Sequence, residues 1–441
     1  MLCAMLRSAL VLSLVSAAGC TFSPAGGDDG VCTPGCDGVE LTTCPAGPTG
    51  APVIETCAEV CVATPAPHCG RWMPSNLDAA TLDPLMTAAT ASLALPGGAD
   101  YTFNTDTGAF RIAGTGVEVP RLGTAFALLE PKMAVLVVDD FTLPAGVTLS
   151  GTGTRALIVV AEGDIELDGV LDFGPGCVLG AEGDTQRCAG PGGGNGGKMG
   201  TVAQGCAGGH NGAGEGGGAG GGFGTKGGLG GAGSSQATAD ELDNCGNTAA
   251  NPLVPLIGGS GGGAGAMMSM ASGGGGGGAV QLSAFGRLRL AGTSVDRATI
   301  YVGGAGGQGS SGNHGGGGGG AGGGILLEGA TVELVEAALI ASGGGGGGGR
   351  GGQPGSDGRI DGGVAAGGTS TGGAGDGGDG AVNASPAENG AAGGRGSGID
   401  GGGGGGGGLG RIRINTTSGQ FTVPTATLTQ GVLSTGRIPG V

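Results

Sequence analysis

The residues from 157 to 172, LIVVAEGDIELDGVLD, decide the fold that this sequence predicts. Three short apolar runs alternate there with two corners, Glu162-Gly163 and Asp168-Gly169. Runs this short and rich in Val, Ile and Leu are typical of β-strands, and the corners are typical of tight turns. The stretch therefore predicts three strands joined by two tight corners.

The same rhythm returns further along the chain, after two earlier runs of the same kind. The runs lie at 133–138, 147–149, 280–284, 287–290, 298–302, 325–328, 331–334, 338–341 and 411–415. A unit of three short strands that stacks on the next unit is what a parallel β-solenoid requires. We therefore predict an all-β fold with a parallel β-solenoid, or β-helix, over residues 133–441. A β-sandwich is the alternative, but long insertions recur at one position of the repeat, which favours coils.

Glycine dominates these insertions, which we place at 174–278, 303–324 and 343–410. It supplies 118 of the 441 residues and forms four unbroken runs, at 273–278, 315–320, 343–349 and 401–408. No strict Gly-X-Y period is apparent and the 21 prolines are few and scattered, which argues against a collagen triple helix. The tracts could be flexible linkers, or extended polyproline-II-like helices that hydrogen-bond laterally on one side of the solenoid. We favour the second, because anchored ends reduce the entropy that ordering costs.

The N-terminus predicts export. Residues 1–19 combine Arg7, an apolar stretch and small residues, as a signal peptide does. The sequence Ala17-Ala18-Gly19-Cys20 resembles a bacterial lipoprotein signal, which implies that Cys20 becomes the lipidated first residue. The alternative is ordinary cleavage nearby with Cys20 left as a thiol. We therefore expect a membrane-anchored protein of the bacterial cell envelope, in the outer membrane or at the cell surface.

Ten further cysteines could all pair in an oxidising compartment. They are Cys32, Cys36, Cys44, Cys57, Cys61 and Cys69 in a small module at 20–70, and Cys177, Cys188, Cys206 and Cys245 in the first glycine insertion. Their connectivity is left open. A zinc site is disfavoured because the one nearby histidine, His68, has no second histidine at the spacing found in zinc fingers. We therefore expect neither a metal nor a cofactor.

The composition excludes a nucleic-acid partner. The net charge is −17, and the 18 Lys and Arg residues form no basic stripe.

Residues 71–132 form a transition region, with a helix near 77–95 that we expect to be interrupted by Pro84 and a turn at 106–108.

Four stretches together resemble a group of glycine-rich bacterial surface lipoproteins. They are Pro74-Ser75-Asn76, Asn104-Thr105-Asp106-Thr107-Gly108-Ala109, Ala161-Glu162-Gly163-Asp164-Ile165 and Gly322-Gly323-Gly324-Ile325-Leu326-Leu327-Glu328-Gly329. The resemblance spans most of residues 72–415. It implies a β-helix of the pectate-lyase-like type, export and a role at the outer surface, without an established chemistry.

The competing interpretation is enzymatic. Asp106, the pair Asp139 and Asp140, His210 and Arg411-Ile412-Arg413 occur in the order seen in polygalacturonase-like β-helix glycosidases, which use aspartates as acid and base. Their spacing does not match, and turn or strand-end roles explain the aspartates equally well. We expect a non-catalytic, structural or adhesive role, with an extracellular polysaccharide or cell-surface partner. The alternative is a glycosidase or carbohydrate binder that uses Asp106, Asp139 and Asp140.

Overall fold

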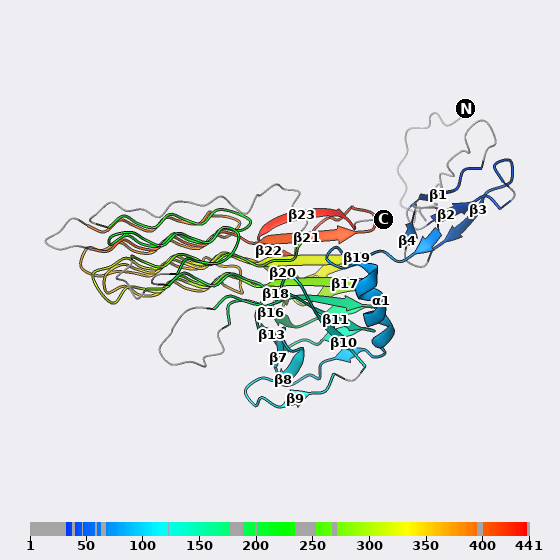
Figure 1. Cartoon of the computed structure of the whole chain (residues 1–441), viewed down its shortest axis with the longest axis horizontal. Coiled ribbons are helices and arrows are strands. Elements are labelled where there is room, and N and C mark those ends of the chain that lie inside the picture. Colours follow the sequence, from blue (N-terminus) through cyan, green and yellow to red (C-terminus); the bar gives the residue numbers. More distant parts are fainter. Residues whose placement is uncertain are drawn as a thin grey trace, which may run out of the picture.

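The computed structural model describes residues 32–37, 40–45, 47–57, 60–62, 68–121, 123–176, 188–198, 201–233, 253–266, 271–394 and 400–438. Strands dominate its secondary structure, and most of them pair in parallel. Along the longest axis a small N-terminal module lies at one end, the strands lie in the middle and extended glycine tracts lie at the other end (Figure 1).

The strands of the middle part form three rows. The first row is β11 (Met133–Val138), β14 (Ala156–Ala161), the first halves of β17 (Ala279–Ala291) and β19 (Gly324–Val335), β21 (Arg411–Thr416) and β23 (Val432–Arg437). The second row is β6 (Leu93–Ala94), β12 (Phe141–Leu143), β15 (Ile165–Leu167) and the second halves of β17 and β19. The third row is β7 (Tyr101–Asn104), β13 (Thr148–Thr152), β16 (Val170–Asp172), β18 (Ala298–Tyr301), β20 (Ala337–Ile340) and β22 (Leu428–Gln430). Every pairing within a row is parallel, which confirms the predicted parallel sheets.

Apolar side chains stack in register within the first row and form the core. Val159 pairs with Leu282, Leu282 with Leu327, and Leu327 with Ile414. All four side chains are buried, because successive strands of a sheet lie about 4.8 Å apart and identical positions fall on one another. The predicted strands at 280–284 and 287–290 differ from the structure in one respect, since both belong to the continuous strand β17, which has a register irregularity between Ala284 and Arg287.

Antiparallel strands close the first end of the rows. β10 (Ala125–Leu129) pairs with β11, and β8 (Ala109–Ile112) pairs with β7 and with β9 (Glu118–Val119). The sequence did not predict these strands. The expected turn at 106–108 is present, and Gly108 there has a φ of +70°, a left-handed value that favours glycine.

The helix α1 (Ala79–Ala88) is shorter than expected and contains Pro84, so the predicted interruption at Pro84 is wrong. The side chain of Asp78 accepts a hydrogen bond from the Thr81 N–H at 2.8 Å and caps the first turn. Leu82 and Met86 are buried on either side of Pro84 in sequence, and this packing holds the helix through the proline. No helix in the described ranges has the length and apolar character needed to span a bilayer.

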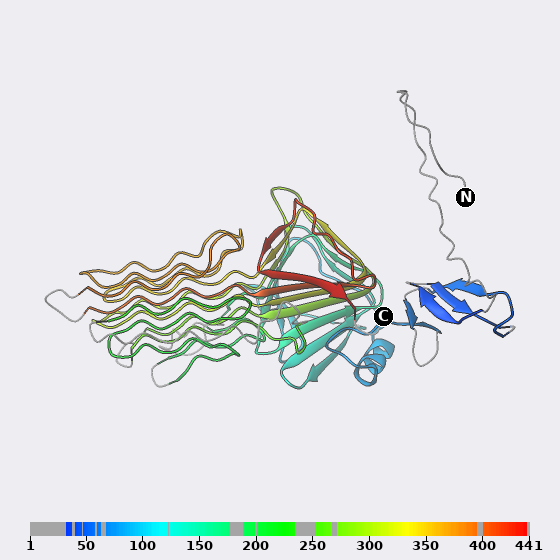
Figure 2. The same cartoon turned by 90° about the horizontal axis from the view of Figure 1, so that it is seen from above.

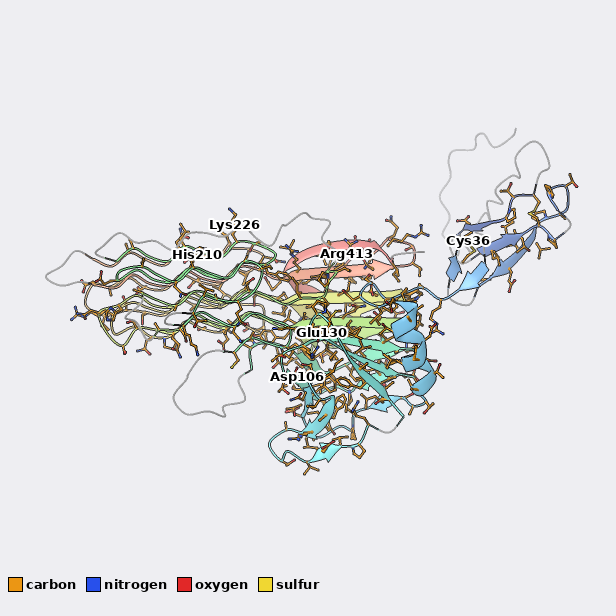
Figure 3. The ribbon with its side chains drawn as sticks, viewed as in Figure 1. Cys36, Asp106, Glu130, His210, Lys226 and Arg413 are labelled. Carbon is orange, nitrogen blue, oxygen red and sulfur yellow. A yellow bond between two sulfur atoms is a disulfide. The ribbon has the colours of Figure 1, made fainter. Side chains whose placement is uncertain are left out.

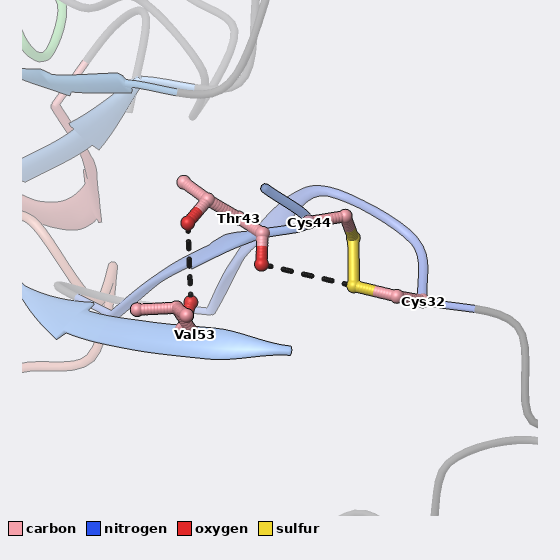
Figure 4. The surroundings of a disulfide bond; sticks show 4 residues. All are labelled: Cys32, Thr43, Cys44 and Val53. Carbon is pink, nitrogen blue, oxygen red and sulfur yellow. Dashed lines mark hydrogen bonds between the residues drawn. A yellow bond between two sulfur atoms is a disulfide. The ribbon is translucent and has the colours of Figure 1, made fainter. Parts of the chain in front are cut away.

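The N-terminal module is held by short antiparallel strands and disulfides. Its strands are β1 (Gly35–Asp37), β2 (Glu40–Thr43), β3 (Val53–Thr56), β4 (Val60–Val62) and β5 (His68–Gly70). Cys32 bonds to Cys44 and Cys36 bonds to Cys61, which confirms a disulfide-bonded module for these four cysteines. Beside the first disulfide, the Thr43 hydroxyl donates to the Val53 carbonyl at 3.5 Å (Figure 4).

The other cysteines divide into two groups. Cys57, Cys188 and Cys206 are also disulfide-bonded, and Cys69 lies in β5. Cys20, Cys177 and Cys245, and with them the predicted signal peptide and lipid anchor, lie outside the described residues.

The glycine tracts lie together on one side of the three rows (Figure 2), and we call them the glycine bundle, which comprises the described residues of 188–233, 256–278, 302–323 and 341–410. Each insertion leaves the stack after a third-row strand, β16, β18 or β20, and returns into a first-row strand, β17, β19 or β21. The chain therefore enters the bundle at the same corner three times.

Backbone hydrogen bonds connect the tract at 401–408 to its neighbours with a period of three residues. Its N–H groups donate to the carbonyls of three segments, at 2.8 to 2.9 Å. Gly403 donates to Ala391 and Gly406 to Glu388 in the first segment. Gly404 and Gly407 donate to Gly347 and Gly344 in the second, and Gly405 and Gly408 donate to Gly218 and Gly221 in the third. Its carbonyls accept from three other segments, through the N–H groups of Gly228 and Gly231, Gly378 and Ala381, and Gly319 and Gly322. Three receiving and three donating segments make six neighbours, so this tract is enclosed on every side.

This enclosure explains why the glycine runs are unbroken. The tracts at 315–320 and 343–349 are bonded to neighbours in the same way. A Cβ atom added at any glycine of these three tracts would overlap the backbone of a neighbour, usually a carbonyl oxygen. Glycine is therefore the one residue type that fits there, because the neighbouring backbones approach too closely for a side chain.

Outer tracts show a three-residue period that the sequence analysis did not detect. Asp376 and Asp379 lie three positions apart with glycines between them, and so do Lys226, Leu229 and Ala232. Asp379 Oδ1 accepts a hydrogen bond from Gly367 N at 2.7 Å, and Asp376 Oδ1 accepts one from Ser370 N at 2.6 Å. At the rim of the bundle these two backbone N–H groups bond to a carboxylate, where an interior N–H would bond to the carbonyl of a neighbouring tract. Part of the negative charge of the chain therefore satisfies backbone donors.

A buried polar network attaches the segment before α1 to the first row. Glu328 of β19 is fully buried and accepts hydrogen bonds from the N–H and hydroxyl of Ser75, from Gln281 Nε2 at 2.8 Å, from Ser283 Oγ at 3.1 Å and from Asn415 Nδ2 at 3.0 Å. A buried carboxylate is tolerated when donors surround it in this way. The network fixes residues 75 and 76 against β17, β19 and β21.

We predict that Gly318→Ala lowers the unfolding free energy by about 3 kcal/mol or more, because its Cβ would overlap the Ala219 carbonyl and packed backbone cannot yield. The control is Gly97→Ala, at an exposed position with open space around it, which should stabilise the protein by about 0.4–1 kcal/mol. Chemical denaturation of the purified chain measures both. Equal effects of the two substitutions would show that the bundle interior is not closely packed.

We also predict that Ser75→Ala lowers the unfolding free energy by about 1.5–3 kcal/mol, because the buried Glu328 carboxylate loses a hydrogen-bond donor. Ser92→Ala is the matched control, since the Ser92 hydroxyl also donates to a carboxylate, that of Asp140 at 3.0 Å, but at an exposed site. Its loss should stay within about 0.5 kcal/mol in the same denaturation experiment. A Ser75→Ala variant as stable as the control would contradict the role of the network.

Candidate functional site

Asp106, the first of the aspartates weighed for catalysis, lies in the turn after β7. Its carboxylate accepts hydrogen bonds from Thr154 N at 3.0 Å and Thr154 Oγ1 at 2.9 Å, and lies 3.8 Å from Arg155 Nε. It therefore lies beside the start of β14, at the corner between the third and first rows.

Asp139 and Asp140 lie beside the opposite end of β14, at the corner between the first and second rows. Asp140 Oδ1 accepts from Asp164 N at 2.8 Å, and the Ser92 hydroxyl bonds to both carboxylates. The six residues of β14 span about 20 Å, so Asp106 is separated by about this distance from Asp139 and Asp140. Hydrolysis by paired carboxylates needs the two carboxyl groups to lie about 5–10 Å apart. The structure brings Asp139 and Asp140 together, but it does not bring Asp106 to them.

The remaining members of the enzymatic set also have structural partners. His210 lies within the glycine bundle, where its carbonyl accepts from Ala219 N at 2.9 Å. The Arg411 guanidinium lies 4.7 Å from the Phe223 ring and donates to the Phe223 carbonyl, and Arg413 Nε donates to Asn415 Oδ1 at 2.7 Å. His210, Asp106 and Arg413 lie in different parts of the molecule (Figure 3).

A different feature combines a cavity with a half-buried acid. A hollow of about 160 Å³ opens on the third row near the base of the glycine bundle, and we call it the Asp172 hollow. Its lining is Ser150, Gly151, Thr152, Asp172, Gly174, Pro175 and Gly176. The stacking of the third row creates it, since Ser150 pairs with Asp172 and Asp172 pairs with Tyr301 in successive strands.

Burial raises the pKa of the Asp172 carboxyl, and the hydrogen bond that its Oδ1 accepts from Gly174 N at 2.9 Å offsets this only in part. Burial also raises the pKa of Tyr301, with a further contribution from the charges of Asp172 and Asp357. The Tyr301 hydroxyl donates to the Gly358 carbonyl, so the phenol is fixed against the bundle, on the strand next to that of Asp172.

Asp172 was not predicted from the sequence as a site residue, although it is the last residue of the stretch 157–172. A carboxylate at a strand end is usually a solvated turn residue. Its neighbours Ser150 and Tyr301 are 22 positions before it and 129 positions after it, and only the strand register brings them together. The recurrence of the repeat was the signal that could have aligned these three positions.

Within the part of the chain that the structure describes, no group of three or more His, Cys, Asp and Glu side chains could hold a metal ion. No family model, curated protein or solved structure matches this chain.

We predict that Asp172→Asn stabilises the protein at about pH 7 and that this gain shrinks toward about pH 4. The raised pKa means that the folded protein binds this proton more readily than the unfolded chain, so the carboxyl destabilises the fold when ionised and less so as the pH falls toward its ordinary value of about 3.9. Thermal unfolding of both proteins across this range measures the difference.

The control is Asp296→Asn, since Asp296 is an exposed turn residue. Its unfolding midpoint should follow that of the unmodified protein at each pH. A gain for Asp172→Asn that is the same at both ends of the range would mean that the carboxyl is not held in a desolvated environment.

Proposed function

We propose that this chain is an exported surface protein, anchored by a lipid on Cys20, whose glycine bundle serves a structural or adhesive role. The observation that carries the proposal is the order of parts along the molecule. The N-terminal module, which follows the proposed anchor, lies at one end and the bundle lies at the other (Figure 1). An anchor at the first end would direct the bundle away from the membrane.

The fold that we propose for this role is a three-sided parallel β-solenoid that carries a bundle of polyproline-II-like glycine helices. In-register pairing of the strands of each row supports the solenoid. The three-residue period of the hydrogen bonds supports the helices, because polyproline II has three residues per turn and no internal hydrogen bonds. Such a bundle holds its shape through backbone contacts and contributes few side chains for chemistry.

The alternative is a polysaccharide-acting protein that uses Asp106, Asp139 and Asp140. It has less support, because β14 separates the first aspartate from the other two and hydrogen bonds within the corners account for all three. The bundle therefore favours a non-catalytic role, and a cell-surface or extracellular polymer is the partner that an outward-facing, acidic protein would meet.

The test is labelling of intact cells with a membrane-impermeant amine reagent. Lys198 and Lys226 are exposed on the bundle, and Lys226 points outward from it (Figure 3). We expect labelling of the unmodified protein on intact cells. With Cys20→Ser we expect loss of the lipid, release from the membrane fraction and loss of cell-associated label.

Cys3→Ser is the matched control, because Cys3 lies inside the proposed signal peptide and should not affect anchoring. Incorporation of a labelled fatty acid separates lipidation from location. A Cys20→Ser protein that remains lipidated and membrane-bound would exclude the proposed anchor. Labelling of the unmodified protein only after cell lysis would exclude the surface location.

A further inference from the structure

The Asp172 hollow contains polar atoms that no described residue uses. Among the described residues, neither the Ser150 hydroxyl nor Asp172 Oδ2 has a protein partner, although Asp172 Oδ1 accepts from Gly174 N. The Thr152 hydroxyl donates to the Phe103 carbonyl at 3.3 Å and retains acceptor capacity. The hollow thus presents one carboxylate oxygen and two hydroxyls on a rigid parallel sheet.

The backbone around the hollow is fixed by close packing. A Cβ at Gly151 would overlap the Phe173 ring at 2.6 Å, and a Cβ at Gly174 would overlap the Tyr301 ring. Glycine at these two positions lets Phe173 fill the core beneath the hollow and lets the Tyr301 ring pack against Gly174. A site whose polar groups are held by such packing needs little rearrangement to bind a ligand.

The chemistry of the lining selects a class of ligand. An anion is disfavoured because the lining contains a carboxylate and no cationic side chain. A divalent cation is disfavoured because one carboxylate falls short of the six or more oxygen ligands that Ca²⁺ or Mg²⁺ takes. A neutral molecule with several hydroxyl groups can both donate to the carboxylate and accept from the serine hydroxyl.

We propose that the Asp172 hollow binds one neutral hexose unit of a saccharide. Its volume of about 160 Å³ is below the roughly 300–1,000 Å³ of drug-sized pockets, as expected for a single sugar ring. The ring lies against Gly174 and Pro175, with its hydroxyls bonded to Asp172 Oδ2 and Ser150 Oγ. Thr102 and Ser150 occupy paired positions on β7 and β13, so further hydroxyl groups of a longer saccharide meet a polar strip along the third row.

The test is binding of simple sugars to the full chain, purified in mild detergent. The probes are glucose, galactose, mannose and N-acetylglucosamine, with galacturonate as an acidic comparison, and saturation-transfer NMR with isothermal titration is the measurement. We expect at least one neutral sugar to bind with a dissociation constant on the order of 1 mM, as a shallow single-ring site allows, and galacturonate to bind at least about tenfold more weakly.

Three variants locate the binding. Asp172→Asn should weaken it by about tenfold, since a charge-assisted hydrogen bond is lost. Ser150→Leu fills the hollow from a partly exposed position without entering the core, and it should abolish binding while the unfolding midpoint stays unchanged. Asp296→Asn, at an exposed turn away from the hollow, should bind as the unmodified protein does.

Two results would overturn the proposal. One is that none of the four neutral sugars binds better than galacturonate, and the other is that Ser150→Leu binds as tightly as the unmodified chain. Because the measurement is made in solution, its outcome is independent of the surface location and of the lipid on Cys20.

Discussion

Backbone hydrogen bonds between glycine tracts are the constraint on which this molecule depends. A tract without side chains has no apolar area to bury, so its N–H and C=O groups must find partners in neighbouring tracts. The tract at 401–408 does so with all six neighbours, and this requires every neighbour to be at backbone-contact distance. The tracts lie close enough to hydrogen-bond to one another, and at this distance no Cβ atom fits between them. Close packing therefore requires glycine in the interior, and glycine in turn permits the close packing.

The three rows of strands provide what the bundle lacks. Their apolar stack, with Val159, Leu282, Leu327 and Ile414 in register, buries enough surface to fix both ends of each insertion. Fixed ends lower the entropy lost when glycine is ordered. The buried network around Glu328 then joins the segment before α1 to β17, β19 and β21, and Asn76 also accepts from Leu256 N at the base of the bundle. The Pro-Ser-Asn stretch that contributed to the resemblance thus has a structural explanation.

The parallel strands were predictable because their apolar runs repeat with clear corners, as at Gly163 and Gly169. The capping strands β8 to β10 were not, since Ala109–Ile112 contains a charged residue and Ala125–Leu129 has no β-branched residue, so tertiary contacts set their pairing. The Asp172 hollow was equally hidden, because its members are joined only by register. The period of three in the outer tracts was missed because glycine at every position of the inner tracts masks it.

That period has a consequence for how the outer surface of this protein can vary. In a helix with three residues per turn and a rise of about 3.1 Å, side chains at every third position project on one line, about 9 Å apart. In the helices proposed for the bundle, Leu229 and Ala232 would stand on such a line; both are partly exposed, and their carbonyls accept from Gly390 N and Gly393 N. Side chains on these outer tracts would therefore stand at a fixed spacing. One of them could be exchanged during evolution without a change in the glycine tracts packed beneath it.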